Sequence, residues 1–268
     1  MSELGTRSLV AVGLLAILAL IVWLGGWFQV CALTFFSVLA VIEMSRMFKH
    51  KEIEICLPPL FIMAGLQYVM LYRFDRYLPI LYAVCFLWAA IDRIVTKRRT
   101  NRDTVATVFT MVYPLALLMC FGFFGFDRMD VSRAAMLMVF AGPSMADNNA
   151  YLFGRRFGKK KLCPDISPNK TVEGYIAGLI GGPIGGILVY FLQRLWGLDI
   201  HWGWLVGLGL IGAVVGQFGD LFASTFKRWA GIKDFGSIFP GHGGIVDRLD
   251  SAMLFAPIVA IAFNLFIR

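Results

Sequence analysis

Charged residues are scarce in this sequence. Aspartate, glutamate, lysine and arginine together make up 16% of its 268 residues, whereas 59% of the residues are hydrophobic. Soluble domains carry about 25% charged residues, so this composition excludes an ordinary soluble protein. The apolar residues also come in long blocks, close to the roughly 20 residues that cross a bilayer as a helix. The sequence therefore predicts an all-α polytopic membrane protein.

Paired cysteine spacings are missing as well. The five cysteines are scattered along the chain, and four of them lie within apolar segments. A disulfide framework or a zinc site requires cysteines at short, regular spacings. We therefore interpret the cysteines as small core residues.

Nine apolar blocks are long enough to cross a membrane. The first five fall in an N-terminal region, 1–133, which contains few residues suited to catalysis. The last four fall in a C-terminal region, 134–268, which is expected to be catalytic. Two polar loops, 154–172 and 224–250, interrupt the second region and are expected in the cytoplasm. The predicted membrane-spanning helices are 9–28, 30–46, 55–72, 77–95, 104–126, 134–153, 173–195, 202–223 and 251–267.

Basic residues concentrate on one side of this predicted topology. Most of the 25 lysines and arginines fall in segments on the same side as the N-terminus. Because cytoplasmic loops carry an excess of lysine and arginine, we predict a cytoplasmic N-terminus and a C-terminus on the opposite side. The net charge of +8 is then explained by topology and by contact with anionic lipid headgroups, and no nucleic-acid partner is expected.

Few ionisable residues fall inside the predicted spans. Asp147 lies within 134–153 and is followed by Asn148 and Asn149. A charge inside a span costs roughly 2.5–3.5 kcal/mol on insertion scales, so we expect Asp147 to face a polar cavity. A polar contact between helices is the alternative. Glu43 and Asp92 lie near the predicted cytoplasmic ends of their helices, where we expect solvated side chains.

The loop 154–172 is basic and ends in the sequence SPNKTVEG, directly before a glycine-rich span. Ser167 or Asn169 is expected to cap that helix, whose N-terminus attracts anions. Lys170 would add a positive charge for a phosphate group. A plain capped helix start explains the same residues equally well. The glycines of the seventh and eighth spans indicate close helix packing.

The densest polar stretch runs from 216 to 251, between two apolar segments. It contains eight charged residues and one histidine. Carboxylates bind divalent cations, lysine and arginine bind phosphate, and glycines let backbone N–H groups approach a ligand closely. This composition indicates a metal-assisted phosphate site.

Three blocks of this region carry a family resemblance. The longest reads STFKRWAGIKDFGSIFPGHGGIVDRLD from Ser224 to Asp250, and it is preceded by DNNAYLFG from Asp147 and by SPNKTVEG from Ser167. Together they resemble the signature of the phosphatidate cytidylyltransferases, or CDP-diacylglycerol synthases. The resemblance covers roughly the C-terminal half of the chain. Asn148 departs from the pattern, which more often has serine or threonine there.

The resemblance implies an activity and a setting. The expected enzyme is an integral-membrane nucleotidyltransferase that forms CDP-diacylglycerol and pyrophosphate from CTP and phosphatidate in phospholipid biosynthesis. Mg²⁺ is the implied cofactor, and a second divalent ion or an accessory monovalent cation stays open. The family also implies a homodimer among the lipids of a bacterial-type inner (plasma) membrane. Its active site would face the cytoplasm and take phosphatidate from the inner leaflet.

The residues that match the signature receive roles from this resemblance and from their chemistry. Asp220 and Asp247 are the expected Mg²⁺ ligands, and Asp250 is the third carboxylate. His242 either contacts phosphate, relays a proton or organises the loop. The expected catalytic residues are Asp220, Asp247, Asp250, Lys227 and His242. The expected substrate- or phosphate-binding residues are Ser167, Lys170, Thr171, Glu173, Arg228, Lys233, Gly243, Gly244, Arg248 and Asp147.

Other classes of membrane protein share some of these features. Intramembrane acids and glycine-rich helices also occur in transporters, but here the polar residues gather at one face of the predicted membrane. A CDP-alcohol phosphotransferase would need a different aspartate pattern, with a spacing that Asp247 and Asp250 do not have. A structural scaffold would not explain the 27-residue match.

Overall fold

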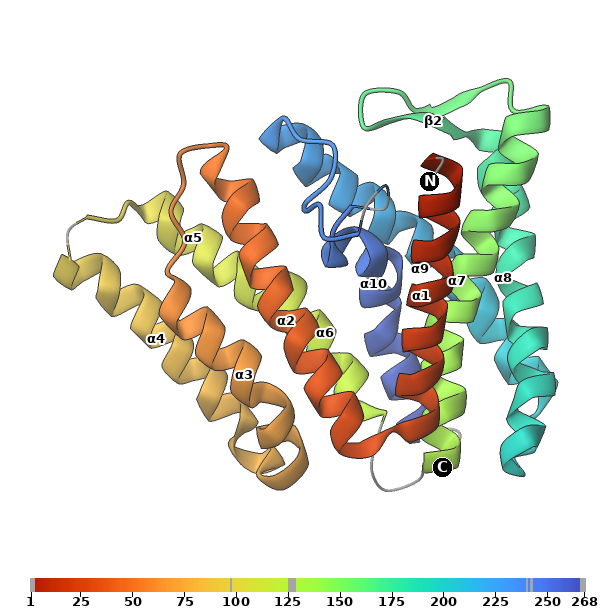
Figure 1. Ribbon diagram of the computed structural model, residues 1–268, viewed down its shortest axis with the longest axis horizontal. Coiled ribbons are helices and arrows are strands. Elements are labelled where there is room, and N and C mark those ends of the chain that lie inside the picture. Colours follow the sequence, from red (N-terminus) through yellow and green to blue (C-terminus); the bar gives the residue numbers. More distant parts are fainter. Residues whose placement is uncertain (1–2, 97, 125–128, 240, 242, 266–268) are drawn as a thin grey trace. The chain divides into compact units, whose positions relative to one another are not determined.

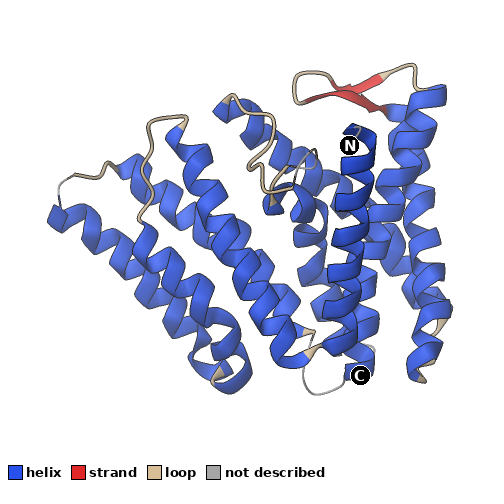
Figure 2. Cartoon of the chain, viewed as in Figure 1, coloured by secondary structure: helices blue, strands red, loops and turns tan. Residues whose placement is uncertain are grey.

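The computed structural model describes residues 3–96, 98–124, 129–239, 241 and 243–265. These residues are nearly all helical, which confirms the predicted fold class at that level (Figure 1 and Figure 2). The helices are α1 (Glu3–Leu24), α2 (Gly26–Lys49), α3 (Leu57–Arg73), α4 (Leu78–Thr96), α5 (Asn101–Thr110), α6 (Leu117–Met119), α7 (Met129–Phe157), α8 (Val172–Gln193), α9 (Trp202–Ala230) and α10 (Ile245–Leu265). A hairpin of β1 (Lys161–Cys163) and β2 (Ser167–Thr171) lies between α7 and α8.

Helical residues cover most of the described part of each predicted apolar block, with two local differences. The first two blocks separate at Gly25, because Gly25 and Gly26 adopt positive φ angles of 55° and 50°. The fifth block is kinked. After α5, a distorted helical stretch contains Pro114, and the chain then continues through α6 to Phe123. Five helical segments of the described chain are long and apolar enough to cross a membrane: Gly26–Lys49, Asp75–Thr96, Asn101–Phe123, Val172–Trp196 and Trp202–Ala230.

The chain divides into two compact units. The first unit comprises Met1–Phe123 and Trp229–Arg248, and the second comprises Phe124–Arg228 and Leu249–Arg268. The boundary falls within α10, so the first turn of this helix belongs to the first unit and the remainder to the second.

Polar side chains link the helices of the first unit. The hydroxyl groups of Ser37 on α2 and Tyr68 on α3 lie 2.9 Å apart, and the amide of Gln67 donates to Ser37 at 3.2 Å. From α4, Tyr82 donates its hydroxyl hydrogen to Gln67 at 3.0 Å. Interhelical hydrogen bonds of this kind hold apolar helices together where the surrounding lipid offers no competing partner.

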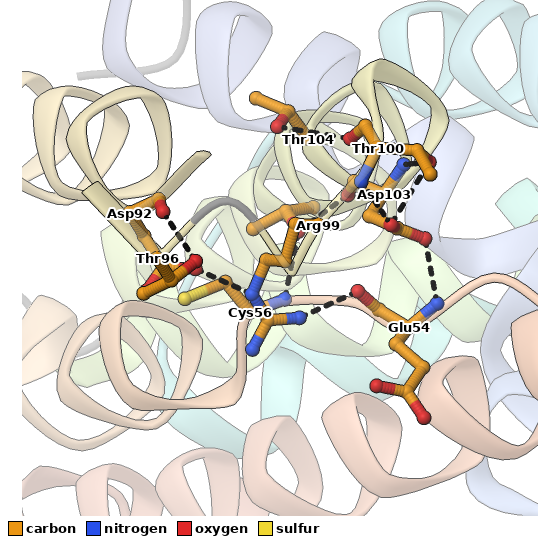
Figure 3. A network of polar contacts seen from close by, with 9 residues as sticks. Glu54, Cys56, Asp92, Thr96, Arg99, Thr100, Asp103 and Thr104 are labelled. Atoms are coloured by element: carbon orange, nitrogen blue, oxygen red, sulfur yellow. Dashed lines mark hydrogen bonds and ion pairs between the residues drawn. The ribbon is translucent and has the colours of Figure 1, made fainter. Parts of the chain in front are cut away.

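A second network of the first unit fixes the segment between α4 and α5 (Figure 3). Arg99 pairs with Asp92 and donates to the carbonyl oxygen of Glu54 at 2.6 Å. Asp103 accepts hydrogen bonds from the backbone N–H groups of Thr100, at 2.6 Å, and Glu54, at 2.8 Å. Thr100 and Asp103 form a reciprocal cap at the start of α5. Asp92 is therefore paired with an arginine, and its side chain stays partly exposed near this end of α4.

Glycines shape the packing of the second unit. A methyl group added to Gly181 or Gly185 of α8 would lie 2.4 or 2.5 Å from a backbone oxygen of α7. On the other side of α8, a methyl group on Gly182 would lie 2.1 Å from the carbonyl oxygen of Gly209 on α9. The missing side chains allow α8 to approach both neighbours closely, which agrees with the packing role predicted for these glycines.

Candidate active site

The β-hairpin and the start of α8 form one end of the second unit (Figure 1). The helix begins at Val172, and the N-cap is Thr171, whose hydroxyl accepts a hydrogen bond from the N–H of Gly174 at 3.1 Å. The predicted caps, Ser167 and Asn169, were wrong, because α8 begins only at Val172 and the residue directly before it is Thr171. The hairpin was not predicted from the sequence.

Glu173 fastens the hairpin to the first turn of α8. Its carboxylate accepts hydrogen bonds from the backbone N–H groups of Lys159, at 3.0 Å, and Lys160, at 3.3 Å. A methyl group on Gly158 would lie 2.6–2.7 Å from the side chain of Thr171, so this glycine lets the two segments meet. Thr171 and Glu173 therefore shape the backbone that carries Lys170.

Replacing Thr171 with alanine tests this structural role. The variant loses the cap of α8 and is expected to lower the free energy of unfolding by about 1 kcal/mol. For a protein of this size that corresponds to a fall of about 2–4 °C in the thermal midpoint, measured in detergent. Thr171→Ser keeps the hydroxyl and should unfold near the wild-type temperature. Equal midpoints for wild type and Thr171→Ala would show instead that the cap of α8 does not contribute to stability.

Lys170 and Asp220 form the first ion pair of a charged cluster in the second unit. The Lys170 ammonium nitrogen lies 2.6 Å from Oδ2 of Asp220, and both side chains are partly exposed. Lys170 comes from strand β2 and Asp220 from α9, so the pair joins two segments distant in sequence. One turn further along α9, the hydroxyl of Ser224 lies 3.5 Å from Oδ1 of Asp220. Both side chains therefore have a defined orientation.

Two further carboxylates lie within the electrostatic reach of Asp220. Asp147 on α7 and Asp250 on α10 both interact with it, and Asp250 also interacts with the ammonium group of Lys227. Asp250 and Lys227 are only 7% and 8% exposed. Ser251 stands between the two carboxylates: its hydroxyl lies 3.4 Å from Oδ2 of Asp147 and 3.5 Å from Oδ1 of Asp250. Five residues predicted for the site thus come together in this unit: Asp147, Lys170, Asp220, Lys227 and Asp250.

The cluster brings like charges close together. Its three carboxylates repel one another, and two ammonium groups offset only part of their charge. Such an arrangement favours the uptake of a cation, while the lysines favour a phosphate group. The cluster can therefore bring a divalent cation and a polyanion to one place.

Asp247 lies in the first unit, at the start of α10. Its Oδ2 accepts hydrogen bonds from the backbone N–H groups of Phe235, at 2.8 Å, and Gly244, at 2.9 Å. Gly243 has a positive φ of 80°, and its carbonyl oxygen accepts from the N–H of Phe239 at 3.0 Å. The Gly244 N–H thus already has a partner within the protein. These bonds fix the orientation of the Asp247 carboxylate.

Glu43 is part of the same region, which the sequence did not suggest. It is fully buried at 0% exposure, and its carboxylate accepts hydrogen bonds from Ile245 and Val246. The expectation of a solvated helix end was wrong, because the segment before α10 covers this end of α2. Ser251 of the second unit was also missed, since a single serine in an apolar helix gives no pattern.

The remaining predicted residues are exposed side chains or lie in the hairpin. Arg228 is exposed and donates from Nε to the carbonyl oxygen of Ile166 in the hairpin, at 3.1 Å. Lys233 and Arg248 are exposed side chains of the first unit. Ser167 pairs with Cys163 in the hairpin. His242 lies outside the described residues.

A complete protein-only metal cage is not found in the part of the chain that the structure describes. No group of three or more histidine, cysteine, aspartate or glutamate side chains is arranged there to hold an ion by itself. An ion with fewer protein ligands would need further oxygen donors from water or from a bound ligand.

Comparison with known proteins adds a family match along the chain. The model of a family described as "Cytidylyltransferase family" matches residues 5–266. The phosphatidate cytidylyltransferase of Staphylococcus aureus (strain COL) is 35% identical over 262 residues, which cover 92% of this chain and 96% of that protein. The same-named protein of Staphylococcus haemolyticus (strain JCSC1435) is 35% identical over 263 residues, or 95% and 97%. That of Staphylococcus epidermidis is 47% identical over 119 residues, 44% of each chain.

Proposed function

This chain belongs to the cytidylyltransferase family, and on that premise we propose that it makes CDP-diacylglycerol and pyrophosphate from CTP and phosphatidate in phospholipid biosynthesis. The observation that carries the proposal is the similarity to phosphatidate cytidylyltransferases over 92% of the chain. The charged cluster of the second unit supports it, because the reaction joins two polyanions. The apolar helices fit a substrate whose acyl chains stay in the lipid.

The chemistry is a substitution at phosphorus. An oxygen of the phosphatidate headgroup attacks the α-phosphorus of CTP, and a new phosphoanhydride bond forms. The bond from the α-phosphorus to the oxygen bridging to the β-phosphate breaks, and pyrophosphate leaves with the electron pair. The attacking oxygen is already anionic, so no strong base is required. Lys170 and Lys227 offset the charge that accumulates as the two substrates approach.

The donor set suits Mg²⁺. This ion takes oxygen ligands and commonly uses one or two protein carboxylates together with substrate phosphates. That agrees with a site that lacks a three-residue cage among the described residues. We assign Asp220 and Asp247 as ligands, and Asp250, which interacts with Asp220, as the third carboxylate. When bound, the ion would neutralise charge on the triphosphate.

We assign the phosphate contacts to lysine and arginine side chains. Lys170 and Lys227 lie within the charged cluster, and Arg228, Lys233 and Arg248 are exposed. Asp147 and Glu173 are assigned to a polar cavity at the site. The N–H of Gly244 donates to Asp247 and is therefore not available to a phosphate group. We assign Gly244 to the conformation of the segment before α10 and not to direct phosphate contact. His242 keeps its three alternative roles.

The membrane arrangement is part of the proposal. We assign nine spans, a cytoplasmic N-terminus and a C-terminus on the opposite side, in a bacterial-type inner membrane. Five long apolar helices support a position in the membrane, and the distribution of basic residues supports the proposed orientation. The site then faces the cytoplasm, where CTP is available, and opens toward the inner leaflet, which supplies phosphatidate. A homodimer is proposed from the family resemblance.

The test is product formation by purified protein in detergent. Radiolabelled CTP and phosphatidate are supplied with Mg²⁺ or with EDTA, and the lipid product is separated by thin-layer chromatography. We expect CDP-diacylglycerol and an equal amount of pyrophosphate with Mg²⁺, and loss of at least about 100-fold of the rate with EDTA. Full activity in EDTA would overturn the metal assignment. Absence of product from any nucleotide would favour a transporter, which flux assays in vesicles would then reveal.

A further inference from the structure

A buried carboxylate of α2 holds the start of α10. Oε1 of Glu43 accepts a hydrogen bond from the N–H of Ile245 at 2.8 Å, and Oε2 accepts one from the N–H of Val246 at 2.9 Å. Both contacts lie within the first unit. The first backbone N–H groups of a helix have no partner inside the helix and carry partial positive charge. Glu43 therefore caps α10 from a helix that is more than 200 residues away in sequence.

Two glycines make room for this carboxylate. A methyl group added to Gly236 would lie 2.5 Å from Oε1 of Glu43, and one added to Gly244 would lie 2.3 Å from the same atom. The three nearest atoms at each position all belong to Glu43. Neither glycine has a positive φ angle. Their lack of a side chain is thus required by Glu43, and not by an unusual backbone conformation.

The held segment carries residues of the proposed site. We define the glycine segment as residues 235, 236 and 243–247. Its Asp247 carboxylate accepts from Phe235 and Gly244 through Oδ2, directly beside the bonds made by Glu43. Two carboxylates thus divide the N–H groups at this helix start between them: Glu43 takes those of Ile245 and Val246, and Asp247 takes that of Gly244. Loss of Glu43 would leave two buried donors unpaired and release one side of the segment.

We propose that Glu43 is a positioning residue that holds the glycine segment in the conformation that binds CTP. This inference rests on the proposed function. A segment that is released populates other conformations, and the apparent affinity for a ligand falls in proportion to the competent fraction. Saturating CTP restores the competent conformation, so the loss appears in KM for CTP and kcat changes little. A role in overall stability alone would lower the amount of active enzyme and leave KM unchanged.

The first experiment compares Glu43→Gln with Glu52→Gln. The amide retains the size of the side chain but presents an NH₂ group to one of the two backbone donors. We expect KM for CTP to rise about tenfold, with kcat within twofold of wild type and KM for phosphatidate unchanged. Glu52 is an exposed residue just beyond α2, so its variant should match wild type. An unchanged KM for CTP in Glu43→Gln would overturn the proposal.

The second experiment is a double-mutant cycle that needs no activity. Gly236→Ala should lower the thermal midpoint in detergent by more than about 5 °C, because the methyl group collides with Glu43. In a Glu43→Ala background the same change should cost less than about 2 °C, since the obstacle is gone. Equal losses in both backgrounds would refute the contact. If wild type makes no CDP-diacylglycerol but the cycle shows coupling, the proposed function fails and the capping role of Glu43 stands.

Discussion

Replacing Asp220 with asparagine is expected to lower the rate of CDP-diacylglycerol formation by about 10²- to 10³-fold. The substitution keeps the shape of the side chain and removes its charge. Lys170, whose ammonium nitrogen lies 2.6 Å from Oδ2, loses its counterion, and the proposed Mg²⁺ site loses a ligand. The repulsion with Asp250 is relieved at the same time, so the protein should stay folded. The measurement is kcat at saturating CTP and phosphatidate, over a range of Mg²⁺ concentrations.

Asp165→Asn provides the matched control. Asp165 is an exposed carboxylate of the hairpin turn in the same unit, and the structure gives it no part in the cluster. Its variant should retain the activity of wild type within about twofold, as expected for a surface substitution. Comparable elution from a sizing column establishes that both proteins are folded. An Asp220→Asn enzyme with wild-type kcat and Mg²⁺ dependence would remove Asp220 from the metal site.

The second large effect is structural and is expected from one methyl group on α8. Gly182→Ala places its Cβ 2.1 Å from the carbonyl oxygen of Gly209, and that oxygen belongs to the backbone of α9. Backbone atoms of a packed helix do not move aside without displacing the whole helix, so we expect a loss of about 3 kcal/mol or more. That is a large part of the 5–15 kcal/mol that stabilises a typical native protein. The measurement is the yield of monodisperse protein and its thermal midpoint.

Gly207→Ala is the same chemical change on α9 with the opposite expectation. A methyl group at Gly207 would have no atom within 4 Å. Alanine has a higher helix propensity than glycine, by about 1 kcal/mol, so this variant should be neutral or slightly more stable. If Gly182→Ala and Gly207→Ala unfold at the same temperature, the close packing of α8 against α9 is not required for stability.

The helices were predictable because their length and apolarity are dictated by the bilayer. The span predicted at 202–223 lies on α9, and the one predicted at 251–267 overlaps α10. The helix ends were less predictable. Helix α9 continues through polar residues to Ala230. Thr171 rather than Ser167 caps α8, because the short strand β2 runs up to Thr171 and the helix begins only after it. A five-residue strand without alternating apolar residues gives no sequence signal.

The site was partly predictable for a different reason. Asp147, Lys170, Asp220 and Asp250 attract attention because charge next to apolar segments requires a partner or a function. Glu43 carries the same kind of charge. Its partners are backbone N–H groups more than 200 residues away. Nearly every residue has such a group, so no sequence pattern marks these two as the partners of Glu43. Only the three-dimensional structure shows the contact.

The contact between Glu43 and α10 has a consequence for biosynthesis. A ribosome delivers Glu43 to the membrane 202 residues before Ile245. At roughly 5–20 residues per second, the nascent chain carries this acid without its final partners for about 10–40 s. A chain that terminates early never acquires those partners, so it keeps an unsatisfied carboxyl group in α2. A truncated copy therefore differs from a finished one by a carboxylate on α2 that lacks the N–H groups of Ile245 and Val246.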